Sequence, residues 1–131
     1  MKVNSKKRGF TIVELVVAMT IIVIVSATAI ALINTQNTIH LRTMQTIEAT
    51  NMAENAIECF RYVDSVDEFE TAYAKTGVTV QNKTTDNAKT TFSFEESNMN
   101  VTITVTSNEL TFVATDITDS SKVILQKSYM K

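Results

Sequence analysis

The chain has 131 residues, which leaves room for one compact domain together with an extended element. Its 12 basic and 14 acidic side chains give a formal net charge of −2, so it lacks the excess of Lys and Arg with which proteins bind nucleic acid strongly without regard to sequence. Its single cysteine, Cys59, excludes an internal disulfide.

An apolar stretch near the N-terminus follows a basic cluster. Positions 6–8 are basic, Gly9 comes next, and positions 10–33 are apolar or small except for Glu14. A helix rises about 1.5 Å per residue, so this stretch extends roughly 36 Å and can cross a hydrocarbon core of about 30 Å. We therefore predict a membrane-spanning helix over residues 10–35.

Two ordinary explanations of such a segment leave features unexplained. A secretory signal peptide has an apolar core of about 7–15 residues and places its small cleavage residues after that core. Here Gly9 lies before the apolar stretch. A plain membrane anchor leaves Glu14 as an uncompensated acid that costs about 2.5 kcal/mol or more.

The sequence KRGFTIVEL, which starts at Lys7, resembles the leader and processing site of type IV prepilins, including the pseudopilins of type II secretion and competence systems. The resemblance covers about the first 30 residues. It implies that a prepilin peptidase cleaves after Gly9, removes residues 1–9 and methylates the new N-terminus at Phe10. Cleavage would remove four of the 12 basic side chains and none of the 14 acidic ones, giving a mature side-chain charge of −6.

Glu14 would lie four residues after the new α-ammonium group of Phe10. Residues four apart share a helix face, so Glu14 could pair with its own amine. The resemblance implies a different partner, the Phe10 amine of a neighbouring subunit, and this contact would set the axial register of a filament. The alternative is a carboxyl group that is protonated in the bilayer or that reaches the interface.

The helical pattern continues beyond the apolar stretch, and the chain has no proline and no glycine between Gly9 and Gly77. We therefore predict that the helix continues, amphipathic, to about residue 63 within a soluble head of residues 36–131. Many major pilins carry helix-breaking glycine and proline in the apolar segment, and this departure favours a minor pilin or a pseudopilin. The residues of the predicted apolar face are Leu41, Met44, Ile47, Met52, Ala53, Ala56, Ile57, Phe60 and Val63.

A second, short helix is predicted over residues 66–75. Ser65 and Glu68 have the spacing of a capping box, and Gly77 stands where a helix C-terminus favours a positive φ. We expect this helix to lie between the long helix and the sheet.

Strands are predicted over residues 78–130, because apolar residues then alternate with polar ones. We expect a polar exposed loop at 82–89, a tight turn at Ser107-Asn108 and a polar loop at 116–121. The result is an α+β pilin fold in which an antiparallel sheet of four to five strands packs on the apolar stripe of residues 44–63. The alternating apolar residues are Val78, Val80, Phe92, Phe94, Val101, Ile103, Val105, Leu110, Phe112 and Ala114.

No group of residues in the sequence indicates catalysis, a metal site or a cofactor. His40 and Cys59 lie 19 positions apart on one predicted helix, roughly 28 Å along its axis, so they cannot form a catalytic pair. Asp116 and Asp119 share a loop, but two carboxylates fall short of the six to eight oxygens that calcium takes, and a solvated turn is expected instead. We therefore predict a protein that is not an enzyme.

The resemblance also implies where the protein resides and what it contacts. It implies a single-pass protein of the cytoplasmic membrane that later enters a surface pilus, or a periplasmic or cell-wall pseudopilus. The implied partners are the prepilin peptidase, the inner-membrane assembly platform, membrane lipid and other pilin subunits. Many pilins of Gram-negative bacteria fasten a C-terminal loop with a cysteine pair, whereas this chain must use packing and hydrogen bonds.

We predict a structural subunit of a type IV pilus, most specifically a minor pilin. The alternative in the same class is a pseudopilin of a type II secretion or competence DNA-uptake system. The alternative in another class is a membrane-anchored extracellular binding module that does not polymerise.

Overall fold

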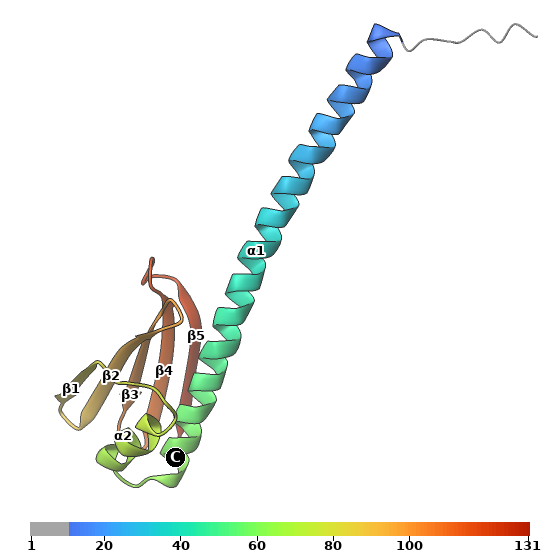
Figure 1. Cartoon of the computed structure of the whole chain (residues 1–131). Coiled ribbons are helices and arrows are strands. Elements are labelled where there is room, and N and C mark those ends of the chain that lie inside the picture. The colour runs from blue at the N-terminus through green and yellow to red at the C-terminus, as the bar shows by residue number, and fades with distance from the viewer. Residues whose placement is uncertain (1–10) are drawn as a thin grey trace, which may run out of the picture. The chain divides into compact units, whose positions relative to one another are not determined.

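The computed structural model describes residues 11–131, so the expected cleavage position at Gly9 and Phe10 lies outside the described residues. The described chain divides into two compact units, one ending at His40 and one running from Leu41 to Lys131. Figure 1 labels the elements, which are α1 (Ile12–Tyr62), α2 (Val66–Ala74), β1 (Asn82–Asp86), β2 (Lys89–Glu96), β3 (Met99–Val105), β4 (Glu109–Asp116) and β5 (Val123–Met130).

Helix α1 is continuous over 51 residues, as the absence of glycine and proline predicts. Its residues up to His40 belong to the first unit, and the remainder forms part of the head. Only the last stretch of the helix is buried, and its small alanines allow the sheet to approach closely. The buried residues recur at helical spacing and are Ala49, Met52, Ala53, Ala56 and Phe60.

The predicted apolar face of α1 is wrong at its N-terminal end. Leu41, Met44 and Ile47 are exposed, and the buried face begins at Ala49. The helical period was read correctly, but periodicity alone does not show how far along a helix the sheet extends.

Helix α2 is where the sequence predicts it. One of the two hydrogen bonds of the predicted capping box is formed with a different residue. The Glu68 N–H donates to Ser65 Oγ at 3.2 Å, while the Glu68 carboxylate accepts from the Asp64 N–H at 3.2 Å and not from Ser65. Gly77 has a φ of +93°, as expected for the residue that ends this region. The chain therefore turns sharply after α2.

Helix α2 contacts both α1 and the sheet through aromatic rings. The Phe69 ring lies 6.4 Å from that of Phe60 on α1 and 5.7 Å from that of Phe92 on β2, measured between centroids. Phe69 also stacks on Tyr73, which in turn faces Phe94. The expected position between helix and sheet is confirmed.

The sheet is an antiparallel meander in which the five strands lie side by side in chain order (Figure 1). Strand β3 is central and alternates strictly between buried and half-buried side chains. Together with the buried faces of β2 and β4, it covers α1 and α2. The fold is thus an α+β, pilin-like arrangement with five strands.

One strand was missed and one was predicted wrongly. Residues 78–81 form no strand, although Val78 and Val80 pack on the core as their alternation suggests. The expected polar loop at 82–89 instead contains β1, the turn at Asn87-Ala88 and the start of β2. Every side chain of β1 is exposed, so this edge strand has no apolar face by which the pattern could reveal it.

The other connections agree with the sequence. Ser107-Asn108 forms a tight connection between β3 and β4, in which the Thr106 N–H donates to the Glu109 carbonyl at 2.8 Å. A polar loop follows β4 and leads into β5, as predicted for residues 116–121.

Candidate functional site

The N-terminal turn of α1 holds Glu14, the predicted assembly residue. Thr11 directly precedes the helix, and its Oγ1 accepts a hydrogen bond from the Glu14 N–H at 3.3 Å. Thr11 and Glu14 thus have the spacing of a capping box, which is a helix-start signal readable in the sequence and absent from the predictions above. A carboxylate in the first turn is also favoured by the helix dipole. Within residues 11–131, the Glu14 carboxylate makes no ion pair.

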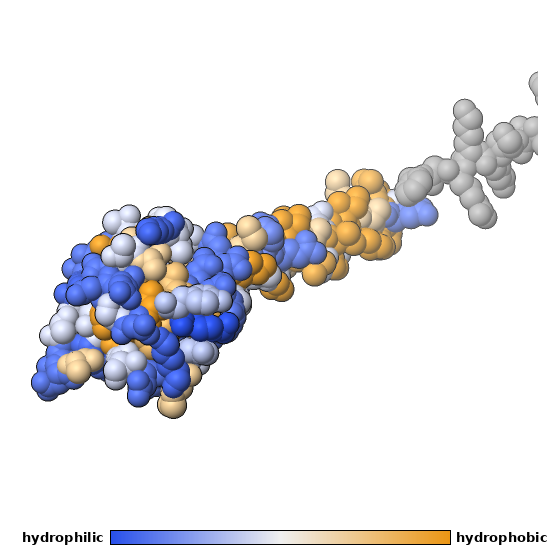
Figure 2. All heavy atoms as spheres, turned by 90° about the horizontal axis from the view of Figure 1, so that it is seen from below, coloured by the Kyte–Doolittle hydropathy of each residue, from blue (hydrophilic) through white to orange (hydrophobic). Residues whose placement is uncertain are grey.

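The apolar stretch of α1 is exposed along its whole described length. Figure 2 shows its hydrophobic side chains on the surface, whereas the visible face of the head is mainly hydrophilic. By length and composition this helix can cross a membrane, and none of its most apolar 18-residue window is buried. A surface of this kind requires lipid or other apolar helices around it.

The hydroxyl groups within the apolar stretch are satisfied inside the helix. Thr20 Oγ1 donates to the Val16 carbonyl at 2.8 Å, and Ser26 Oγ donates to the Ile22 carbonyl at 2.7 Å. Thr28 Oγ1 donates in the same way to Val25. These hydroxyl groups therefore need no water, which lowers the free-energy cost of placing the stretch in an apolar environment.

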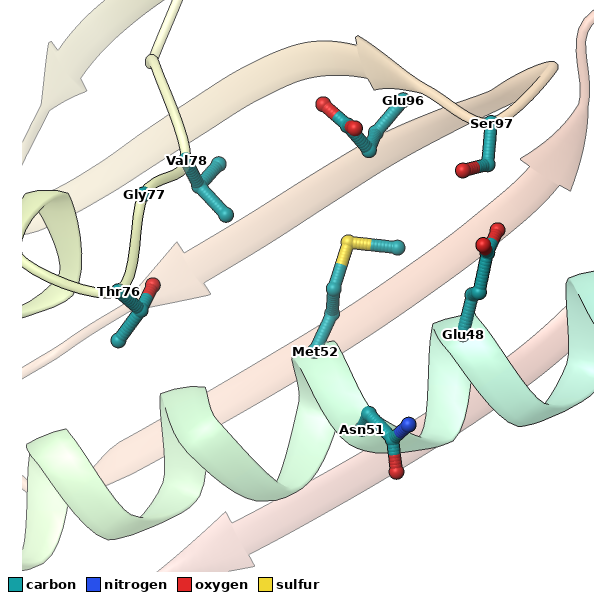
Figure 3. Close-up of a pocket in the computed structure, with 8 residues that line it drawn as sticks. All are labelled: Glu48, Asn51, Met52, Thr76, Gly77, Val78, Glu96 and Ser97. Carbon is teal, nitrogen blue, oxygen red and sulfur yellow. The ribbon is translucent and has the colours of Figure 1, made fainter.

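A groove of about 260 Å³ lies on the head between α1, the segment after α2 and the turn from β2 to β3. Figure 3 shows Glu48 and Met52 rising from α1 toward Glu96 and Ser97, while Val78 points toward α1. Met52 and Val78 supply apolar surface. Polar groups surround them, and the remaining lining residues are Asn51, Thr76 and Gly77.

The carboxylates of this groove are not used by the ion pairs of the head. Lys83, Lys122, Lys127 and Lys131 all make ion pairs with other acids. In the described part of the chain, no ion pair reaches Glu48 or Glu96. The groove therefore combines an apolar floor with two uncompensated negative charges.

No pattern in the sequence marks the groove. Neither Glu48 nor Glu96 has a role predicted from the sequence. The groove depends on a turn in which Ser97 and Asn98 have φ values of 51° and 61°, and no glycine marks this turn in the sequence. Spacing along the chain gave no sign that the three segments meet.

Burial shifts the pKa values of Cys59 and Tyr73 in the same direction. Burial is the largest influence on Cys59 and raises the pKa of its thiol, and the neighbouring Glu58 raises it further, so a reactive thiolate is disfavoured. Burial also raises the pKa of Tyr73, whose hydroxyl group is enclosed and has no hydrogen-bond partner within residues 11–131. His40, in the other unit, is exposed.

The loop after β4 holds its own carboxylates. Asp116 accepts from the Thr118 hydroxyl at 2.7 Å, from the Thr118 N–H at 3.0 Å and from Lys122 Nζ at 3.0 Å. Asp119 accepts from the Ser121 hydroxyl and N–H. Among the described residues, no three His, Cys, Asp or Glu side chains are grouped closely enough to hold a metal ion.

The comparisons with known proteins concern the N-terminal segment. Residues 4–30 match the family model described as the prokaryotic N-terminal methylation motif. No curated protein and no solved structure matches the chain. With the exposed apolar helix and the α+β head behind it, this match supports placing the chain in the family of type IV prepilins and pseudopilins.

Proposed function

We propose that the protein is a structural subunit of a type IV pilus, most specifically a minor pilin. The observation that carries this proposal is the methylation motif at residues 4–30, continued by an apolar helix whose side chains are exposed. The coarser statement, a pilin-like or pseudopilin subunit, follows from the motif itself.

The precursor is anchored in the cytoplasmic membrane through the apolar half of α1. Prepilin peptidase cleaves after Gly9 and methylates Phe10, and the assembly platform then moves the helix from lipid into a filament with other pilin subunits. Because both surroundings are apolar, the same exposed side chains suit both. The internally bonded hydroxyl groups of the helix suit both for the same reason.

Glu14 pairs with the Phe10 α-ammonium group of a neighbouring subunit in this proposal. A carboxylate moved into an apolar filament core is tolerated when an opposite charge lies within a few Å. Within residues 11–131 nothing else neutralises Glu14, and its backbone N–H is already bonded to Thr11.

The continuous helix favours a minor pilin or a pseudopilin over a major pilin. A stretch of 51 residues without glycine or proline has no built-in site at which to bend or melt. A pseudopilin would share this property. Long surface filaments that contain the protein would favour a pilus, and their absence in a strain with an active secretion or DNA-uptake system would favour a pseudopilus.

Mass spectrometry of the mature protein tests the processing step. We expect a chain that begins with N-methylated Phe10. An unmethylated chain that begins at any other residue would contradict the proposal.

Substitution of Glu14 tests the assembly step. We expect Glu14→Ala to be processed normally and to fall at least about tenfold in sheared filaments relative to the membrane pool, because an unpaired ammonium group then remains in an apolar core. Thr11→Ala is the matched control, since it removes the capping hydroxyl but keeps the carboxylate, and it should assemble. If Glu14→Ala enters filaments at the wild-type level, the assembly role is wrong.

A further inference from the structure

The groove beside the β2–β3 turn has the chemistry of a receptor for a cationic side chain. Glu48 and Glu96 supply negative charge, and Met52 and Val78 supply an apolar surface along which an aliphatic stem can lie. Lysine and arginine combine these two properties. No cation of the described chain forms an ion pair with either carboxylate.

Three basic side chains among residues 11–131 have neither an ion pair nor a ring contact, namely Arg42, Lys75 and Lys89. Arg42 precedes Glu48 on α1, and Lys75 precedes Thr76 of the groove lining, so both lie near the groove of their own copy. Lys89 differs from them in position. It begins β2, whereas Glu96 ends the same strand.

Lys89 and Glu96 are therefore separated by the length of β2, roughly 24 Å at about 3.4 Å per residue. One copy cannot insert Lys89 into its own groove. Lys89 follows the Asn87-Ala88 turn, and although Asp86 is its register partner on β1, no ion pair joins the two side chains. Lys89 is exposed, and it lies at the opposite end of β2 from Glu96.

We propose that the groove lined by Glu48 and Glu96 receives Lys89 from the β1–β2 hairpin of a second copy of the chain. Two observations identify the occupant. The charge of Lys89 complements that of the groove, and Lys89 and Glu96 lie at opposite ends of β2. A contact between two different surfaces is heterologous, and when its rotation does not close a ring it repeats into an open helical array. This inference rests on the proposed filament function. It assigns a contact between the heads of two subunits, which the N-terminal helices do not supply.

Zero-length cross-linking tests the contact directly. A carbodiimide joins a carboxylate to an amine only where the two touch, so it is applied to the full-length chain in detergent micelles, prepared as a mixture of ¹⁵N-labelled and unlabelled protein. We expect peptides that join Lys89 of one isotope to Glu48 or Glu96 of the other. The proposal would be overturned if Glu48 or Glu96 were cross-linked only to Lys75 of the same isotope, and no product joined Lys89 of one isotope to a groove carboxylate of the other.

Charge variants test the same contact in cells. We expect Glu96→Lys and Lys89→Glu each to lower filament incorporation several-fold, the double variant to restore it, and Lys89→Arg to assemble while losing the cross-link. Glu95→Lys is the matched control, because Glu95 adjoins Glu96 on β2 but does not line this groove. Wild-type incorporation of Lys89→Glu would contradict the contact.

The two tests separate the inference from the proposed function. Mixed-isotope products without any filament-borne protein would leave the contact standing and refute the filament role. Incorporation that depends on Glu14 but not on Glu96 or Lys89 would leave the filament role standing and refute the contact.

Discussion

Asp116, at the end of β4, is a residue whose surroundings change its acidity. The Thr118 hydroxyl is the largest influence, and with the Thr118 N–H and Lys122 it lowers the pKa of the Asp116 carboxyl to about 2. Each of these donors favours the ionised form. Because the pKa of the folded state lies below the unfolded value of 3.8, Asp116 stabilises the head above pH 4.

This stabilisation is expected to disappear as the pH falls from about 4 to about 2. We predict that Asp116→Asn melts at a lower temperature than the wild type at pH 7, and that the difference shrinks through this window. Thermal unfolding of the full chain in micelles, followed by tyrosine circular dichroism, measures it. Thr118→Val should raise the Asp116 pKa in a carboxyl ¹³C titration, and an unchanged midpoint would contradict the assigned cause.

The β1–β2 hairpin is the element whose sequence fits its backbone least well. Asn87 and Ala88 have φ values of 43° and 67°, the combination of a type I′ turn, for which Asn-Gly is the preferred pair. Alanine in the left-handed region is strained by about 1–2 kcal/mol because its Cβ crowds the backbone.

We therefore predict that Ala88→Gly stabilises the head by about 1 kcal/mol, since relief of strain exceeds the entropy that glycine adds to the unfolded chain. Chemical denaturation of the full chain measures the change. Ala74→Gly, at the end of α2, is the opposite control and should destabilise the head by up to about 1 kcal/mol. Equal effects of the two substitutions would show that the turn is not strained.

Elements could be predicted from the sequence where individual side chains determine them. Helix α2 was found because Ser65, Glu68 and Gly77 each perform a local task that depends on residue type. Strand β1 was missed because its pairing with β2 is made by backbone groups, which no side-chain pattern records. The groove was missed for a related reason, since it depends on where three distant segments meet.

The head as a whole must secure its C-terminal strand without a disulfide, and β5 does so through contacts with α1. Lys127 pairs with Glu54, the Tyr129 ring packs edge-on against Phe60 at 6.3 Å, and Lys131 Nζ donates to the Val63 carbonyl at 2.5 Å. Inward-facing residues of β5 thus reach α1, and Lys131, which follows β5, reaches the residue just after α1.

Tyr129 makes two of the contacts between β5 and α1. Besides packing against Phe60, its ring lies under the Arg61 guanidinium, 5.5 Å from the ring centroid. We predict that Tyr129→Ala destabilises the head by about 2 kcal/mol through lost burial and lost ring contacts. The adjacent Met130, 73% exposed, provides the control, and Met130→Ala should change stability by less than about 0.5 kcal/mol. Denaturation of both full-length variants compares them. If the two were equally stable, β5 would be held by its pairing with β4 alone, and the contacts with α1 would not replace a disulfide.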